Sequence, residues 1–147
     1  MALIDKFPQI KIPNKFYKNT GDLLFQDLAD SIVNDKSTYS NGAVYADLDN
    51  DGDLDVVVNN IDDPVLVYEN KHNDKGDRSF ADITLKGSEK NTNAIGAKII
   101  EFTNDQVRTY ENYPVRGFQS SMQIPIHVGL DKTKVDSMFI AADCGSI

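Results

Sequence analysis

The feature that most constrains this chain is the run from Asp47 to Asp55, in which an aspartate occupies every second position and Gly52 stands among them. Carboxylates this close together repel one another, and burying them in a core without a partner is costly. A hard cation removes the repulsion, because Ca²⁺ takes about six to eight oxygen ligands from carboxylates and carbonyls. Calcium loops use alternating positions around a glycine at the sharp turn, so this run predicts a calcium-binding loop.

The spacing also predicts which groups face the cation. With the first aspartate as position 1, carboxylates are expected from the first, third, fifth and ninth residues and a backbone carbonyl from the seventh. The expected metal ligands are therefore Asp47, Asp49, Asp51, Asp53 (through its carbonyl) and Asp55. Mg²⁺ suits the loop less well, because it demands tighter octahedral geometry and retains its waters.

The sequence around the loop excludes an EF-hand, although the same spacing begins one. An EF-hand closes with a bidentate glutamate at its twelfth position, and Val58 stands there. The flanking segments 43–46, 54–58 and 65–68 are short and rich in β-branched and aromatic residues, which is typical of strands. The loop is therefore expected to join two strands, and to act as a structural staple instead of a switch.

The rest of the chain also favours strands. An aromatic-rich hairpin is expected over 16–28 around Gly21, and a turn at 40–42. Beyond the polar stretch 71–78, a candidate domain boundary, the apolar runs lie at 80–85, 95–102, 107–113, 124–128 and 135–140. The predicted fold is all-β: a propeller-blade-like antiparallel sheet followed by a sandwich-like or barrel-like domain. The predicted parts are an extended lead-in (1–14), a repeat region (15–70) and a β domain (79–147).

Composition narrows the classes of partner. The net charge of −8 argues against nucleic acid and anionic membranes, both of which require basic patches. No apolar run approaches the ~20 residues of a membrane-spanning helix, so no membrane insertion is expected. The single Cys144 permits no internal disulfide. Residues 1–12 show no apolar core of a signal peptide, so the chain is either cytosolic or a piece of a longer exported protein.

Two family resemblances cover roughly residues 14–140. Residues 42–58 with Val67-Tyr68-Glu69-Asn70 resemble the FG-GAP/VCBS-type repeat, one blade of a calcium-binding β-propeller. The second half is similar to the ASPIC/UnbV domain, which follows such repeats in exported bacterial proteins and in cartilage acidic protein-like proteins. That similarity rests on the segments 85–87, 93–98, 116–121, 127–130 and 135–137. The family usually ends in Trp-Pro-x-Gly, whereas this chain has Ala142-Asp143-Cys144-Gly145.

These resemblances imply the C-terminal portion of a longer exported protein, located outside the cell, at its surface or in the periplasm. A propeller needs several blades, and this chain supplies about one and a half. Its exposed sheet edges would be covered by the second domain or by another copy of the chain, so a homodimer is one expectation.

Two functional hypotheses follow. The first is a non-enzymatic, calcium-binding adhesion module with a protein or glycan ligand; the second is an accessory domain of a carbohydrate-active enzyme. No residue is expected to be catalytic: His127 has no second ligand at zinc spacing, and Ser120 lies in no nucleophile elbow. Both are expected to form structural hydrogen bonds. Tyr45, Tyr110, Tyr113 and Phe118 could line a sugar- or protein-binding face, although ordinary strand packing is the favoured explanation for them.

Overall fold

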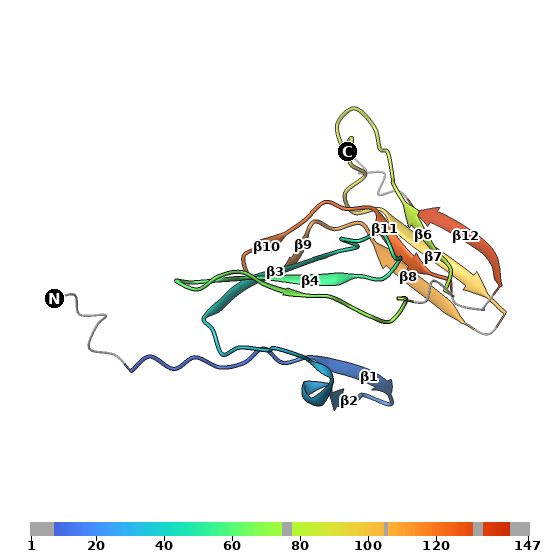
Figure 1. Ribbon diagram of the computed structural model, residues 1–147. Helices are drawn as coiled ribbons and strands as arrows, with labels where there is room; N and C mark the ends of the chain where they lie inside the picture. Colours follow the sequence, from blue (N-terminus) through green and yellow to red (C-terminus); the bar gives the residue numbers. More distant parts are fainter. Residues whose placement is uncertain (1–7, 75–77, 105, 131–133, 142–147) are drawn as a thin grey trace.

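The computed structural model describes residues 8–74, 78–104, 106–130 and 134–141. Within these ranges the chain forms short antiparallel strands and one 3₁₀ turn, Ala29–Ser31, with no α-helix (Figure 1). The predicted all-β fold is confirmed. The end of the chain at 142–147, including Cys144 and the divergent closing residues, lies outside the described residues.

Among the described residues, the strands assemble into five small antiparallel sheets. The first half contributes β1 (Tyr17–Gly21), β2 (Leu24–Asp27), β3 (Ser40–Ala46), β4 (Asp55–Asn60) and β5 (Leu66–Tyr68). The second half contributes β6 (Phe80–Ile83), β7 (Lys98–Thr103), β8 (Val107–Glu111), β9 (Val115–Gly117), β10 (Ser120–Ser121), β11 (Ile126–Gly129) and β12 (Val135–Ala141). The sheet orders are β1-β2, β3-β4-β5, β6-β11, β9-β10 and β12-β7-β8.

Most strands lie where the sequence pattern predicts them. The hairpin expected over 16–28 is present as β1 and β2, and Gly21 adopts the positive φ of +95° that its turn requires. The prediction of a turn at 40–42 is wrong, because Ser40 and Gly42 belong to β3, which pairs with β4. The register of β3 against β4 shifts between Ser40 and Gly42, so the glycine marks a bulge within a strand.

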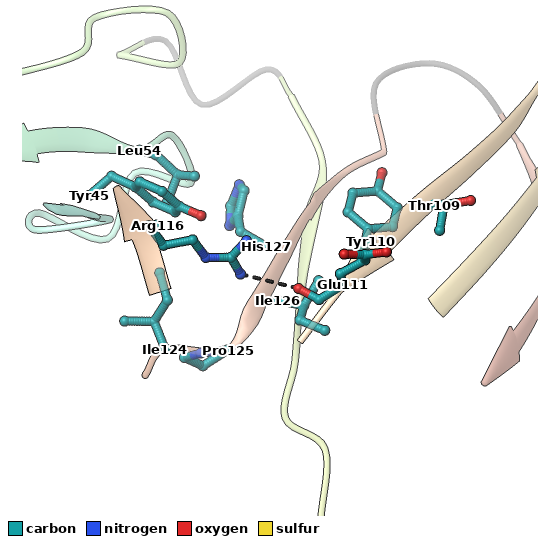
Figure 2. Close-up of a pocket in the computed structure, with 10 residues that line it drawn as sticks. All are labelled: Tyr45, Leu54, Thr109, Tyr110, Glu111, Arg116, Ile124, Pro125, Ile126 and His127. Carbon is teal, nitrogen blue, oxygen red and sulfur yellow. Dashed lines mark hydrogen bonds between the residues drawn. The ribbon is translucent and has the colours of Figure 1, made fainter. Parts of the chain in front are cut away.

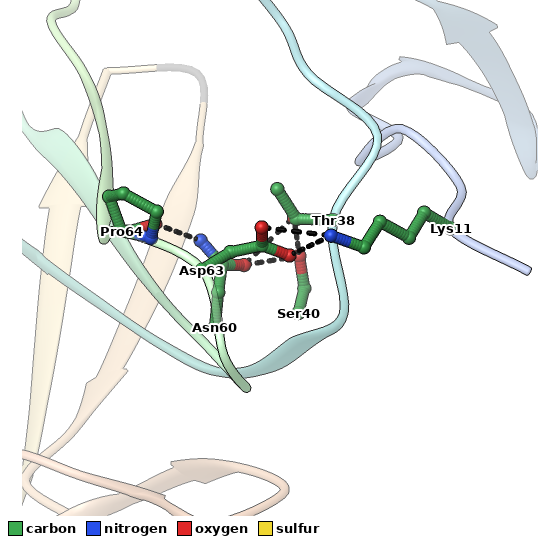
Figure 3. Close-up of polar contacts among 6 residues, drawn as sticks. All are labelled: Lys11, Thr38, Ser40, Asn60, Asp63 and Pro64. Carbon is green, nitrogen blue, oxygen red and sulfur yellow. Dashed lines mark hydrogen bonds and ion pairs between the residues drawn. The ribbon is translucent and has the colours of Figure 1, made fainter. Parts of the chain in front are cut away.

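Polar contacts hold the N-terminal segment against the β3-β4-β5 sheet (Figure 3). Lys11 forms an ion pair with Asp63 at 2.6 Å between Nζ and Oδ2. Close by, the buried Asn60 accepts hydrogen bonds from the hydroxyls of Thr38 and Ser40 through Oδ1, at 2.8 and 3.1 Å. Because a single amide oxygen satisfies two hydroxyls, this polar group can be buried without an unpaired atom.

The apolar core of the second half lies where the β6-β11 pair meets the β12-β7-β8 sheet. Its fully buried members are Ile99 on β7 and Val128 on β11, with Ile126 beside them. Tyr110 on β8 packs against this cluster and donates a 3.0 Å hydrogen bond to the carboxylate of Glu101, which is itself fully buried. Burial raises the pKa of Tyr110, and the hydrogen bond to Glu101 adds to the rise.

The short β9–β10 hairpin attaches the second half to the first. The backbone N–H of Ala43 on β3 donates to the hydroxyl of Ser120 at 2.9 Å, and the amide of Asn41 donates to Gln119 Oε1 at 2.7 Å. A side chain at Gly42 would meet the carbonyl of Gln119 and the hydroxyl of Ser120, so the glycine allows the close approach. Ser120 therefore has the hydrogen-bonding role expected of it, and it serves the contact between the halves.

Candidate metal centre

The acidic loop connects β3 to β4 at the end of the antiparallel sheet. Ala46 and Asp55 are a cross-strand pair, and the residues between them form the loop. Asn50 and Gly52 both adopt positive φ angles, +61° and +89°. Asparagine and glycine are among the residues that tolerate this conformation best, so the local sequence suits the tight path of the backbone.

The loop is folded by hydrogen bonds from its own backbone to its aspartates. Asp47 accepts from the N–H of Gly52 at 3.1 Å through Oδ2. Asp49 accepts from the N–H of Asp51 at 3.3 Å, and Asp51 accepts from the N–H of Asp53 at 3.0 Å, each through Oδ1. Each of these three carboxylates thus uses one oxygen to shape the loop and keeps the other for another partner.

The remaining oxygens are the ones that suit a cation. Oδ1 of Asp47, Oδ2 of Asp51 and Oδ1 of Asp53 are buried and have no hydrogen-bond partner among the described residues. Asp47, Asp49 and Asp51 each offer an oxygen within 4.8 Å of those of the other two. Two oxygens on one Ca²⁺ can be at most about 5.2 Å apart, twice the longest usual Ca–O distance, so this trio fits a calcium ion.

Asp53 and Asp55 have surroundings that the spacing alone does not predict. Both oxygens of the buried Asp55 accept backbone N–H groups, from Asn70 at 2.8 Å and from Leu48 at 3.1 Å. Its carboxylate therefore already ties the loop to the chain beyond β5. Asp53 keeps an open carboxylate oxygen in addition to the carbonyl expected as its ligand. Whether either residue binds metal stays a prediction.

Electrostatics at Asp53 reflect this crowding of charge. The residue exposes 7% of its surface, and this burial is the largest cause of the raised pKa of its carboxyl group. The charges of Asp51 and Asp55 raise the pKa of Asp53 further, whereas the backbone N–H of Asn73, 2.8 Å from Oδ2, opposes the rise. A cation at the open oxygens would supply the missing positive charge.

The segment after β5 packs directly on the loop, which sequence reasoning missed. The side-chain amide of Asn73 donates to the carbonyl of Asp51, and Asn73 is 2% exposed. The ring of Phe80, the first residue of β6, covers Gly52 so closely that any Cβ there would clash with it. The polarity of 71–78 suggested only a boundary, because the sequence does not indicate which groups a polar connection contacts.

Phe80 continues the contact into the second half. Its ring stacks on that of His127, with centroids 5.2 Å apart and planes at 25°. Nδ1 of His127 lies 2.8 Å from Oδ1 of Asp82. The structural, hydrogen-bonded role expected of His127 thus has a definite partner. From the acidic loop to this pair, the chain forms one continuous series of contacts.

Comparison with known proteins identifies part of the chain. The family model described as ASPIC and UnbV matches residues 87–141, a range that includes β7 to β12. The predicted ASPIC/UnbV domain is confirmed there, and domains of this family are typically extracellular. The match does not extend to the acidic loop, whose resemblance to an FG-GAP/VCBS repeat remains a prediction. Searches of curated proteins and of solved structures gave no match.

Among the described residues, no helix is long and apolar enough to cross a membrane.

Proposed function

We propose that this chain is a calcium-binding module of an exported protein, in which Ca²⁺ stabilises the acidic loop and the domain that follows it. The observation that supports this proposal is the set of buried, unpartnered carboxylate oxygens on Asp47, Asp51 and Asp53. A buried acceptor without a partner costs about 1–3 kcal/mol, and more when it is charged. A divalent cation held by the cluster of Asp47, Asp49 and Asp51 would give the carboxylates of Asp47 and Asp51 their missing partner.

The contacts around the loop favour a structural role for the ion. Asp55, Asn73 and Phe80 connect the loop to the chain after β5 and to β6. Fixing the loop would therefore also fix the start of the second half. The non-enzymatic reading rests on this arrangement, because every loop aspartate has either a neighbouring backbone partner or an oxygen directed to the common cluster.

The parent protein would use this module for adhesion, through a protein or glycan ligand. The extracellular character of ASPIC/UnbV domains supports an exported location. The alternative is an accessory domain of a carbohydrate-active enzyme, in which catalysis belongs to another part of the parent. Both readings require the same loop, and they differ in what the rest of the protein does.

Calorimetric titration with CaCl₂ tests the proposal. The wild-type chain is expected to bind one Ca²⁺ with a dissociation constant of about 10⁻⁴–10⁻³ M, the range of extracellular modules. Asp51→Asn removes one unit of charge from the cluster and is expected to weaken binding at least about tenfold. Asp22→Asn is the matched control, since this exposed aspartate in the β1–β2 turn has a positive φ that asparagine also tolerates.

The outcomes separate the proposal from a solvated acidic turn. Binding that is lost in Asp51→Asn and kept in Asp22→Asn supports a built site. Absence of binding heat together with an unchanged melting temperature in chelator would refute calcium binding. Equal affinity in both variants would mean that the ion is attracted by the general negative charge of the chain.

A further inference from the structure

A second candidate site lies between the two halves, next to the acidic loop. It is a pocket of about 320 Å³, within the range of small-ligand sites (Figure 2). Tyr45 on β3 and Leu54 at the end of the acidic loop form one wall. Arg116 on β9, His127 on β11 and residues of β8 form the rest. Neither half could form this pocket alone.

Arg116 supplies the positive group of the pocket. Its guanidinium donates one hydrogen bond, from Nη2 to the backbone carbonyl of Glu111 at 3.2 Å, and no other acceptor for it is found in the described part of the chain (Figure 2). The carboxylate of Glu111, which also lines the pocket, is paired with Lys98 at 2.7 Å and interacts electrostatically with Arg116 as well. The planar guanidinium, with donors to spare, matches a carboxylate bidentately.

His127 supplies an acceptor. A carboxylate only accepts hydrogen bonds, so the 2.8 Å contact between His127 Nδ1 and Asp82 places the ring proton on Nδ1. In the uncharged tautomer with its proton on Nδ1, Nε2 is an acceptor, and the side chain of His127 lines the pocket while exposing only 12% of its surface. An acceptor of this kind suits a ligand hydroxyl. Tyr45 adds both a phenol hydroxyl and an aromatic face to the same space.

We propose that this pocket binds a sugar acid, a saccharide ring that carries a carboxylate. Arg116 would bind the carboxylate, Nε2 of His127 would accept a ring hydroxyl, and the ring of Tyr45 would contact the apolar face of the saccharide. A peptide C-terminus also offers a carboxylate and an N–H donor, but it lacks the flat apolar ring face that would lie on Tyr45, so the combination favours a sugar acid. The inference deepens the proposed function, because it identifies the class of glycan that such a module would recognise.

The test is a binding titration of the full chain in saturating CaCl₂, followed by NMR or calorimetry, with D-glucuronic acid as the probe and D-glucose as its uncharged counterpart. Glucuronic acid is expected to bind at least about tenfold more tightly than glucose, because a carboxylate–guanidinium pair is a charge-assisted interaction. Arg116→Gln is expected to remove that difference, and Arg116→Lys to restore part of it. Lys18→Gln makes the same change of charge on the exposed β1 strand and is expected to leave binding unchanged.

Each alternative result overturns the assignment. Equal binding of glucose and glucuronic acid, or no binding of either, would exclude a sugar-acid site. Tighter binding of N-acetyl-leucine than of glucuronic acid would assign the pocket to a peptide C-terminus. Calcium binding is measured in the same samples, so failure of the sugar-acid proposal with an intact calcium site is distinguishable from failure of the proposed function.

Discussion

Asp53→Asn is expected to stabilise the chain in the absence of calcium and to reduce the stabilisation that calcium provides. Without a cation, Oδ1 of Asp53 is a buried, charged acceptor without a partner, beside Asp51 and Asp55. An asparagine keeps the acceptor that the N–H of Asn73 requires and loses the charge. The variant should therefore be more stable than the wild type in chelator, by about 1–3 kcal/mol.

With calcium the advantage of the variant should shrink. At about 5 mM Ca²⁺ and a dissociation constant of ~10⁻⁴–10⁻³ M, binding stabilises the wild-type chain by about 1–2 kcal/mol through mass action. Asp53→Asn loses most of this gain, because the loop offers the cation one negative charge fewer. Urea unfolding in chelator and in calcium measures both effects.

Asp49→Asn is the matched control for this experiment. Asp49 belongs to the same cluster but is exposed, so water already satisfies its charge. In chelator its substitution should change stability by no more than about 0.5 kcal/mol, whereas the calcium response should still fall. If Asp53→Asn lowered stability in chelator as well as in calcium, the open oxygen would not be a cost to the cation-free fold, and the reasoning would be wrong.

Three further predictions follow from the same structure. Because the pKa of Asp53 is raised, its ionised form destabilises the cation-free fold; this cost is absent below the ordinary carboxyl range and fully present above the raised pKa. Protons should therefore compete with calcium for Asp53. Calcium titrations should show weaker binding at about pH 4.5 than at neutral pH. Gly52→Ala should lower stability by about 1–3 kcal/mol in urea unfolding, through its positive φ and the contact with Phe80, and Phe80→Leu should recover part of the loss. Tyr110→Phe should cost about 1.5–3 kcal/mol in the same assay, because it removes the partner of the buried Glu101, and a smaller loss in the background of Glu101→Gln would confirm the pair.

The sequence alone predicts the positions of most of the strands and of the acidic loop. Alternating and β-branched runs are local signals, and β4, β6, β7, β8, β11 and β12 fall within or beside the runs that predict them. The same logic failed at 40–42, where Asn41-Gly42 has the composition of a turn and lies within a strand. A tertiary contact determines the conformation at this point. Gly42 is needed so that Ser120 can approach β3 closely, and it does not serve to reverse the chain.

The contacts that complete the candidate site were beyond sequence reasoning. Asn73 and Phe80 reach the loop across the chain, and nothing in their local sequence specifies that neighbour. The roles of Asp53 and Asp55 also depend on burial, which equal spacing cannot reveal. The pocket around Arg116 requires β3, β8, β9 and β11 together, so only the folded chain brings its donor and acceptor into one space.

The contact of Phe80 with Gly52 has a consequence for how such chains can be recombined. The polar connection at 71–78 looks like a natural point at which to separate the first half of the chain from the second. A cut there would separate Phe80 from Gly52. If the cut preceded Asn73, the hydrogen bond from Asn73 to the carbonyl of Asp51 would be lost as well. An isolated first half would carry an uncovered loop, and an unrelated domain grafted behind it would need an aromatic residue at the same offset. The two parts are therefore expected to be inherited, exchanged and expressed as one unit.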